Sequence, residues 1–393
     1  MDFSNASIAP EEEMPDNKAP DFPQCSGDRY IDASQWDKWL GEWFLIYFFE
    51  YKYFEKLIIT VLFPIVLAFG FIGNAGFLFV IARVKEMHTL TNFYLANLAV
   101  ADLLYVTLTT VTYCIQYALS GGLRNSEIFR SNAQCFIGYG IHYTTLYASL
   151  SLVTLVTFER VLAICYPLKH RMVNTKKRTI VLVVISWTVA VAMSAAFGAP
   201  VAGLVRKECI SWPPGGRWKK FPNIRHECIT VHDVYFDPIS KLCVPIPFII
   251  VLVINIILYG KIIACLSNRT VTQNKEHAGQ SSTNKVRNQV ARMVIINGII
   301  FFLCLAPFQY HQLYQLIVLK TKMYLYDGDT EKAILWASRC LLVLNSAVNP
   351  YVYGFTNHRY RSAFMKAIGR GKKSNSHPNV KTKTSFISQN IRQ

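Results

Sequence analysis

The stretch from Ile180 to Val205 reads IVLVVISWTVAVAMSAAFGAPVAGLV and contains no charged residue. At a rise of 1.5 Å per residue, a helix of this length crosses the roughly 30 Å hydrocarbon core of a bilayer. Similar apolar runs occur along the rest of the chain. The approximate spans of all these runs are 57–82, 91–118, 132–164, 179–203, 241–266, 289–318 and 333–355. Because backbone polar groups in lipid must be satisfied internally, the runs predict an all-α membrane protein, a seven-transmembrane helix bundle.

The overall composition agrees with a membrane protein. Of the 393 residues, 52% are hydrophobic and only 17% are charged, against about 25% charged residues in an average soluble protein. Such hydrophobicity argues against disorder. The net charge of +17 would suggest a nucleic-acid binder, but the charges are rare and bunched between the apolar runs. We therefore expect membrane lipids, and no nucleic acid, among the partners.

Lysine and arginine are concentrated on one side of the predicted bundle. The loops 83–90, 165–178 and 261–292 and the tail from Thr356 hold 22 of them, with only two acids. The positive-inside rule places this side in the cytoplasm and the N-terminal tail outside. That tail lacks the apolar segment of a signal peptide, so the first span is expected to direct targeting. It carries a glycosylation sequon at Asn5.

Short motifs fall on the apolar runs in a defined order. They are Gly73-Asn74, Leu95-Ala-Asn-Leu-Ala-Val-Ala-Asp102, Glu159-Arg160-Val161, Trp187, Tyr259, Pro307 and Asn349-Pro350-Tyr351-Val352-Tyr353. Together they resemble the rhodopsin-like (class A) G-protein-coupled receptors, over about residues 57–368. Three segments look most like the neuropeptide receptors for neuromedin U, thyrotropin-releasing hormone and ghrelin: Met87–Asn92, Cys304–Phe308 and Asn345–Pro350.

The resemblance implies a receptor of the plasma membrane and not an enzyme. It implies an extracellular neuropeptide ligand, and a heterotrimeric G protein, of the Gq class, as the partner inside. The expected organisation is an extracellular tail over 1–56, a receptor domain over 57–355, and an amphipathic helix with a cytoplasmic tail over 356–393. Serine and threonine in that last tail make arrestin a further partner, with a merely disordered tail as the alternative.

Four formal charges lie within the cores of the predicted spans: Asp102, Glu159, Arg160 and Arg339. A charge in the bilayer is costly and is a functional candidate by default; the alternative is polar contact between helices. For Glu159 and Arg160 the resemblance implies an ion pair that holds the inactive state and releases the arginine to the G protein. The other switch residues that it implies are Tyr259, Pro307, Asn349, Pro350 and Tyr353.

Asp102 is the deepest acid of the second span. By resemblance, Asn74, Ser149, Asn345 and Asn349 face it and form an oxygen-rich site for a sodium ion, since hard cations prefer oxygen ligands. A water-filled hydrogen-bond network with Asp102 protonated is the alternative. No other cofactor is expected.

Arg339 lies ten residues before Asn349, about three turns further out. An unpaired guanidinium there would attract a carboxylate, a carbonyl or an amidated peptide end; the alternative is pairing with Glu331 or Asp329. Other candidate ligand contacts are His142, Gln116, Tyr117, Tyr143, Gln309, His311 and Gln312. By resemblance, His142 replaces the aspartate of amine receptors and Val343 replaces the retinal lysine, so neither an amine nor retinal is expected.

Cys25, Cys135, Cys209 and Cys228 fall on the predicted outer side, where disulfides form. The resemblance ties Cys135 to the second outer loop, with Cys228 favoured and Cys209 as the alternative partner; Cys25 would then take the remaining cysteine. The six others are interpreted as small apolar helix residues: Cys114, Cys165, Cys243, Cys265, Cys304 and Cys340.

Three further segments carry expectations. In the loop from Val205 to Lys241, the cluster Pro213–Gly216 predicts a hairpin turn. The aromatic segment from Trp36 to Phe54 predicts an anchor in the headgroup region, or a lid that touches ligand. His358–Ile368 predicts a short amphipathic eighth helix.

Other functions for a membrane protein of this kind predict sequence features that can be looked for, and those of a transporter, a channel or an enzyme are missing from this sequence. A transporter or channel would show internal repeats or broken helices with paired charges. A membrane enzyme would show metal-ligand spacing or a Gly-x-Ser-x-Gly motif. A class A receptor for a non-peptide ligand remains as an alternative. A non-signalling decoy remains as well, because Leu305 stands where the family usually has tryptophan.

Overall fold

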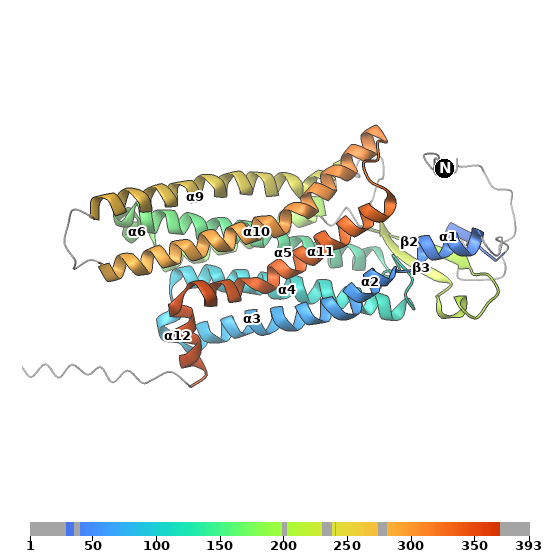
Figure 1. Cartoon of the computed structure of the whole chain (residues 1–393), viewed down its shortest axis with the longest axis horizontal. Coiled ribbons are helices and arrows are strands. Elements are labelled where there is room, and N and C mark those ends of the chain that lie inside the picture. The colour runs from blue at the N-terminus through green and yellow to red at the C-terminus, as the bar shows by residue number, and fades with distance from the viewer. Residues whose placement is uncertain are drawn as a thin grey trace, which may run out of the picture.

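The computed structural model describes residues 29–34, 40–198, 203–229, 238–239, 241–273 and 281–369. Long helices run side by side, with a small sheet at one end of the bundle (Figure 1). The helices are α1 Leu40–Phe49, α2 Tyr53–Leu57, α3 Phe63–Arg83, α4 Leu90–Leu119, α5 Asn132–Cys165, α6 Pro167–Val173, α7 Lys176–Met193, α9 Pro245–Gln273, α10 Ser281–Thr321, α11 Gly328–Thr356 and α12 His358–Ala367. We call the end that carries α1 and the sheet the outer end, and the end that carries α6 and α12 the inner end.

Six helical segments in the described part of the chain are long and apolar enough to cross a membrane. They are Tyr53–Arg83, Leu90–Leu119, Asn132–Cys165, Lys176–Phe197, Pro245–Ser267 and Gln289–Thr321. The seventh long helix, α11, lies lengthwise in the same bundle (Figure 1), but acidic residues in its first turn and polar residues along its buried face lower its hydropathy. The predicted seven-helix membrane fold is confirmed.

Polar residues fix where several of these helices begin. In each case a side-chain oxygen accepts a hydrogen bond from a backbone N–H of the first turn, which satisfies a donor that has no partner inside the helix. The capping residues are Thr89 for α4, Ser131 for α5, Thr175 for α7, Asp327 for α11 and Asn357 for α12. Asn357 thereby separates α11 from the predicted amphipathic helix, which the structure shows as α12.

The outer end carries a three-stranded sheet in the order β1-β2-β3. Strands β2 (Leu204–Ser211) and β3 (Ile224–Ile229) form the antiparallel hairpin that the Pro-Gly cluster predicts. Strand β1 (Arg29–Asp32) adds parallel to β2 with Tyr30 opposite Cys209, which the sequence did not indicate. The N-terminal region is thus hydrogen-bonded to the hairpin at the outer end.

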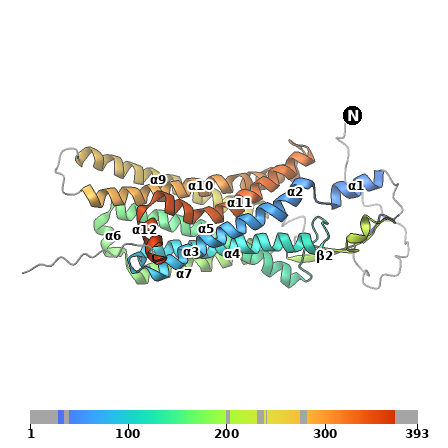
Figure 2. The same cartoon turned by 60° about the horizontal axis from the view of Figure 1, so that its bottom comes forward.

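Helix α1 packs against the hairpin and the loop 120–131, here called the first outer loop. A small apolar cluster at this contact joins Leu45 and Phe49 of α1 with Leu123, Ile210, Trp218 and Phe221. Figure 2 shows α1 and the strand β2 extending beyond the ends of the long helices. The opposite side of α1 leaves Trp43, Phe44 and Phe48 exposed. Helix α1 therefore covers the outer loops with one face and presents rings outward with the other, while the predicted Trp36 and Trp39 of the aromatic segment lie outside the described residues.

Glu55 joins three separate parts of the outer end. Its carboxylate is almost fully buried and lies 2.5 Å from Arg124 of the first outer loop. It also accepts a hydrogen bond of 2.8 Å from the indole N–H of Trp336 on α11 and one of 2.6 Å from the backbone N–H of Lys52. Burying a carboxylate is costly unless it is paired and hydrogen-bonded in this way. Helix α2, the loop and α11 are therefore held in one arrangement.

At the inner half of the bundle, Gly298 of α10 provides the space for Tyr259 of α9. A Cβ at position 298 would overlap the Tyr259 hydroxyl. That hydroxyl accepts a hydrogen bond of 3.4 Å from Thr157 of α5. The absent side chain of Gly298 therefore lets α9 and α10 pack closely around a buried tyrosine.

We expect Gly298→Ala to lower stability, by about 1–3 kcal/mol as is typical of overpacking, because Tyr259 must leave its site. Gly260→Ala on α9 is the matched control, since nothing lies within 4 Å of a Cβ there; alanine should be neutral or stabilising in that helix. Thermal unfolding of the purified protein measures both. Equal losses of stability in the two variants would contradict this packing.

Candidate functional site

Arg339 of α11 stands between aromatic rings in the outer half of the bundle. Its Cζ lies 5.6 Å from the centroid of the Tyr113 ring and 5.3 Å from that of Trp336, which are cation–π distances. The two acids considered as partners are engaged elsewhere: Asp329 pairs with Lys52, and Glu331 accepts a hydrogen bond from Gln315. No carboxylate of the described residues forms an ion pair with Arg339.

Two histidines from other helices share the electrostatic environment of Arg339. His142 of α5 and His311 of α10 both interact with its charge. The Nδ1 of His142 lies 3.3 Å from the hydroxyl of Thr109, and its ring is 4.7 Å from that of Tyr105. The structure thus brings together three of the predicted ligand contacts, from α5, α10 and α11.

The remaining predicted contacts are more dispersed. Gln309 is buried, and both its amide oxygen and its amide nitrogen lack a hydrogen-bond partner among the described residues. The Tyr117 ring lies 5.8 Å from Tyr51, whereas the Tyr143 ring stacks at 6.4 Å on Tyr147. Gln116 and Gln312 are partly exposed on α4 and α10. An unsatisfied buried amide is costly, so Gln309 is the one of these residues that most needs a further partner.

Several residues around Arg339 were not identified from the sequence. Trp336 contacts Arg339 directly and also hydrogen-bonds Glu55, which in turn pairs with Arg124. One signal was available: Trp336 precedes Arg339 by three residues, a spacing that places two side chains on the same helix face. The roles of Glu55 and Arg124 depend on long-range contacts that have no local pattern.

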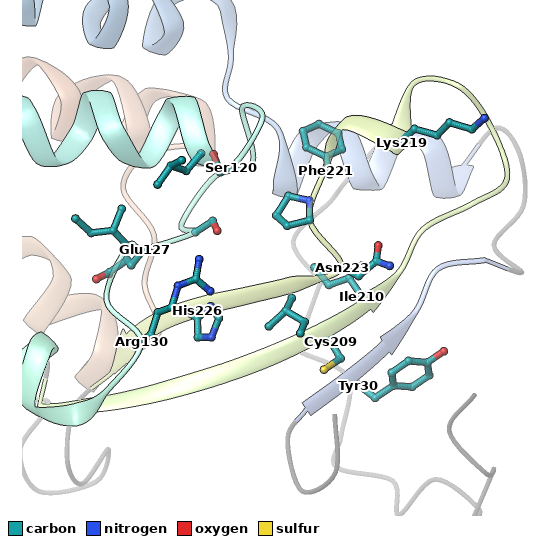
Figure 3. A pocket seen from close by; sticks show the side chains of 15 residues that line it. Tyr30, Ser120, Glu127, Arg130, Cys209, Ile210, Lys219, Phe221, Asn223 and His226 are labelled. Atoms are coloured by element: carbon teal, nitrogen blue, oxygen red, sulfur yellow. The ribbon is translucent and has the colours of Figure 1, made fainter. Parts of the chain in front are cut away.

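A cavity of about 630 Å³ lies at the outer end, between the first outer loop and the hairpin. Figure 3 shows side chains from both segments around it. Its lining includes Tyr30, Ser120, Ser126, Glu127, Arg130, Ile210, Lys219, Phe221, Asn223 and His226. The volume is within the range of about 300–1,000 Å³ that is typical of ligand sites. Arg130 and Lys219 are exposed and make the lining more cationic than anionic.

Glu127 connects this cavity to the start of α5. Its Oε1 accepts a hydrogen bond of 2.9 Å from the hydroxyl of Tyr139, and its backbone N–H donates to the carbonyl oxygen of His226 at 2.7 Å. Its Oε2 is buried without a hydrogen-bond partner in the described structure. Burial raises the pKa of the Glu127 carboxyl to about 7. Near neutral pH this carboxyl is therefore only partly ionised.

At the inner end, Glu159 and Arg160 form an ion pair of 2.9 Å between Oε2 and Nε. Thr91 of α4 contacts both side chains, and Nε2 of His170 on α6 lies 3.0 Å from Glu159 Oε1. Neither of these two partners was foreseen. The pair is thus tied to α4 and α6 as well as to its own helix.

The other predicted switch residues lie deeper in the bundle than Arg160 and are separate from it. Tyr259 is bonded to Thr157, and the Tyr353 ring lies 5.3 Å from Phe77 and 5.9 Å from Tyr360. Pro307 and Pro350 lie inside α10 and α11. In the described structure no hydrogen bond or cation–π contact joins either tyrosine to Arg160.

Around Asp102, the amide nitrogen of Asn349 donates to Oδ2 at 2.6 Å, and that of Asn74 donates to the Ser346 carbonyl oxygen at 2.8 Å. Buried oxygens without a partner in the described structure are Asp102 Oδ1, Asn74 Oδ1, Asn345 Oδ1 and Asn349 Oδ1. Ser149, the remaining predicted ligand, is buried on α5. Orphaned oxygens of this kind fit a hard cation such as sodium.

The predicted Cys135–Cys228 disulfide is present and ties the hairpin to the start of α5. Cys209 is also disulfide-bonded. Cys25 and the sequon at Asn5 lie outside the described residues. One expectation is wrong: Cys165 and Cys265 are not separate apolar residues but form a disulfide between α5 and α9. The sequence could not show this, because it does not reveal which residues of two helices meet.

The comparisons with known proteins agree with this architecture. The sequence model of the family described as 7 transmembrane receptor (rhodopsin family) matches residues 73–353. The chain belongs to this family of receptors, which is not a family of enzymes, and it is a multi-pass membrane protein.

Its relatives include several peptide receptors. It is 26% identical to the neuromedin U receptor homolog nmur-2 of Caenorhabditis elegans, over 79% of this chain and 78% of the relative. It is 25% identical to G-protein coupled receptor 54 of Oreochromis niloticus (80% and 79% covered) and to the thyrotropin-releasing hormone receptor of Gallus gallus (81% and 80% covered). These relatives support the neuropeptide-receptor branch inferred from the motifs.

Glu127 should make the stability of the outer end depend on pH. Because burial raises its pKa in the folded state to about 7, above the usual 4.5, its stabilising contribution is present at pH 4 and is lost as the pH rises to about 7. We expect Glu127→Gln to remove this loss, which amounts to more than about 1.4 kcal/mol, the equivalent of one pKa unit.

Thermal unfolding of the purified receptor between pH 4 and 8, with and without the substitution, measures the effect. Glu42→Gln is the control, because that carboxylate is partly exposed on α1 at the same end of the protein and is not among the charges that shift the pKa of Glu127. Identical pH profiles for wild type and Glu127→Gln would contradict the assignment.

Proposed function

We propose that this protein is a plasma-membrane receptor for a neuropeptide, with the outer end extracellular and the inner end cytoplasmic. The observation that carries the proposal is Arg339, a guanidinium without an ion-pair partner among the described residues, held inside the outer half of the bundle. A cation placed there at the cost of desolvation is best explained by a ligand that completes it. The names of the relatives, receptors for neuromedin U and thyrotropin-releasing hormone, favour a peptide.

The ligand chemistry follows from the groups that lack partners. A C-terminal carboxylate or an amidated end fits Arg339, because a guanidinium donates to both. The buried amide of Gln309 offers both a donor and an acceptor to a peptide backbone. The cavity between the first outer loop and the hairpin, which is lined by Arg130 and Lys219, would receive a further part of the peptide that carries negative charge. A peptide whose side chains and ends are only apolar or cationic does not fit these groups.

Signalling would use the inner end. A peptide that binds one arrangement of the helices better shifts the equilibrium towards it. In the shifted state Arg160 leaves Glu159 and meets a heterotrimeric G protein, of the Gq class by similarity to peptide receptors. The cluster of Asp102, Asn74, Asn345 and Asn349 would hold a sodium ion, which neutralises the buried carboxylate in the resting state. Ser149 completes the set that we assign to this site.

Two further partners are proposed from the C-terminal part of the chain. Helix α12 is strongly amphipathic, and its Lys366 pairs with Glu86 of the loop after α3 at 2.9 Å. This arrangement suits a helix that rests on membrane lipids. The serine- and threonine-bearing tail after it lies outside the described residues, and we propose arrestin as its partner.

A calcium assay in cells that express the receptor, with a panel of synthetic neuropeptides, tests the function. Activation by a peptide with an acidic or amidated end is expected. Activation by a lipid or an amine but by no peptide would overturn the peptide assignment. Peptide binding without G-protein activation would identify a non-signalling receptor instead.

Arg339→Ala should lower the potency of the activating peptide at least ~10-fold, because a buried charged contact is typically worth 2 kcal/mol or more. Lys332→Ala is the control on the same helix, since Lys332 lies 4.1 Å from the Tyr47 ring centroid, near the helix start. Surface expression is measured for both variants. Unchanged potency in Arg339→Ala would remove this residue from the binding site.

Arg160→Ala should abolish G-protein activation and leave peptide affinity within about threefold, because Arg160 is far from the outer half and is proposed to contact the G protein. Nucleotide exchange on purified Gq and binding of a labelled peptide measure the two properties separately. Arg171→Ala, an exposed cation on α6, serves as the control. Full activation by the Arg160 variant would exclude it as the coupling residue.

A further inference from the structure

A disulfide at the inner end joins the last residue of α5 to the inner third of α9. Cys165 and Cys265 are bonded, with their Cα atoms 5.6 Å apart. Both side chains are partly buried against the core, where Val161 of α5 and Ile262 of α9 are among the buried residues. The two sulfurs thus face each other in a formed helix–helix contact and do not depend on a mobile loop to meet.

The compartment makes this bond unusual. In the proposed orientation, on which this inference rests, the inner end faces the cytoplasm, where glutathione and thioredoxin keep thiols reduced. The disulfides that do occur in that compartment are mostly transient, and are catalytic or redox-sensing. The outer bond between Cys135 and Cys228 is in an oxidising environment and is explained as a structural bond. Cys165 and Cys265 need a different explanation.

We propose that Cys165 and Cys265 are a reversible oxidative modification site. A small disulfide such as oxidised glutathione oxidises the two thiols, and the Cys165–Cys265 bond that forms links α5 to α9. In the first step the thiolate of one cysteine attacks the glutathione disulfide, forming a mixed disulfide and releasing one glutathione thiolate. In the second step the other cysteine thiolate displaces the second glutathione. Two thiols are oxidised, one glutathione disulfide is reduced, and the two protons pass to the released glutathione thiolates.

Both redox states fit the structure. In the reduced state the thiol of Cys165 has an acceptor in place, because its sulfur lies 3.5 Å from the carbonyl oxygen of Lys261, one turn before Cys265. The surrounding contacts are apolar and suit a reduced cysteine, which packs as a small hydrophobic residue. Opening the bond therefore leaves no buried polar group without a partner, as a reversible site requires.

The position of the bond, close to Arg160 along α5, suggests an effect on coupling to the G protein. Cys165 follows Arg160 by five residues on α5, and Cys265 follows Tyr259 by six residues on α9. The oxidised pair holds the two helices in the arrangement in which Arg160 is paired with Glu159 and Tyr259 with Thr157. A transition that shifts α9 relative to α5 is then blocked until the bond is reduced.

The chain allows a direct chemical test. Trypsin releases Cys165 in the peptide Val161–Lys169 and Cys265 in the peptide Ile262–Arg269. Full-length receptor in lipid nanodiscs is equilibrated with glutathione buffers of increasing oxidised fraction, alkylated and digested. Mass spectrometry should show the linked pair of peptides rising with oxidation and disappearing in reduced glutathione. Two alkylated free cysteines at every buffer ratio would overturn the modification site.

The functional arm compares oxidised and reduced receptor in nucleotide exchange on purified Gq, driven by the panel of synthetic peptides. Oxidation should lower exchange about tenfold, an ordinary size for allosteric coupling, and reduced glutathione should restore it. Cys265→Ser should be insensitive to oxidation. Cys304→Ser, which removes a free cysteine on α10, should behave as wild type.

The outcomes separate this inference from the proposed function. If the linked peptides form but exchange is equal in both redox states, the consequence for coupling is wrong. If no exchange occurs in any redox state, the G-protein proposal and the consequence for coupling both fail, while the peptide measurement still decides the modification site. Oxidation sensitivity that persists in Cys265→Ser would assign the effect to another cysteine and overturn the inference.

Discussion

Burial among the helices, away from bulk solvent, constrains every polar group in this bundle. A charge or an amide placed there must find a partner within the protein, because the lipid offers none. Glu159 meets this requirement through Arg160, Thr91 and His170, and Glu55 meets it through Arg124, Trp336 and a backbone N–H. The arrangement of the helices at both ends of the bundle depends on these contacts.

The exceptions to this requirement mark the sites. Arg339 has aromatic faces but no carboxylate of the described residues, and Gln309 has no hydrogen-bond partner among them. In the cluster of Asp102 and its asparagines, four buried side-chain oxygens also lack a hydrogen-bond partner among the described residues. These groups lie at two depths, one where a ligand from outside would arrive and one where a small cation would fit. The unsatisfied polar groups thus separate the proposed binding region from the proposed ion site along one bundle.

The two ends of the bundle are stabilised by different means. At the outer end, the Cys135–Cys228 bond, the hairpin and the packing of α1 build a covered platform around a cavity. At the inner end, the contacts of the Glu159–Arg160 pair with α4 and α6, a tyrosine contact and the Cys165–Cys265 bond connect α5 with its neighbours. This asymmetry suits a protein that receives a signal on a fixed surface and responds at a movable one.

The sequence by itself determined the seven spans, the hairpin turn, the amphipathic α12 and the family, because apolar length, turn residues and motif order are local properties. It also identified Arg339, Asp102 and the Glu159–Arg160 pair, since a charge inside an apolar run stands out. It missed strand β1, the network of Glu55, Arg124 and Trp336, and the bond between Cys165 and Cys265. These features join residues far apart in the chain, and only the packing of the helices decides which side chains meet.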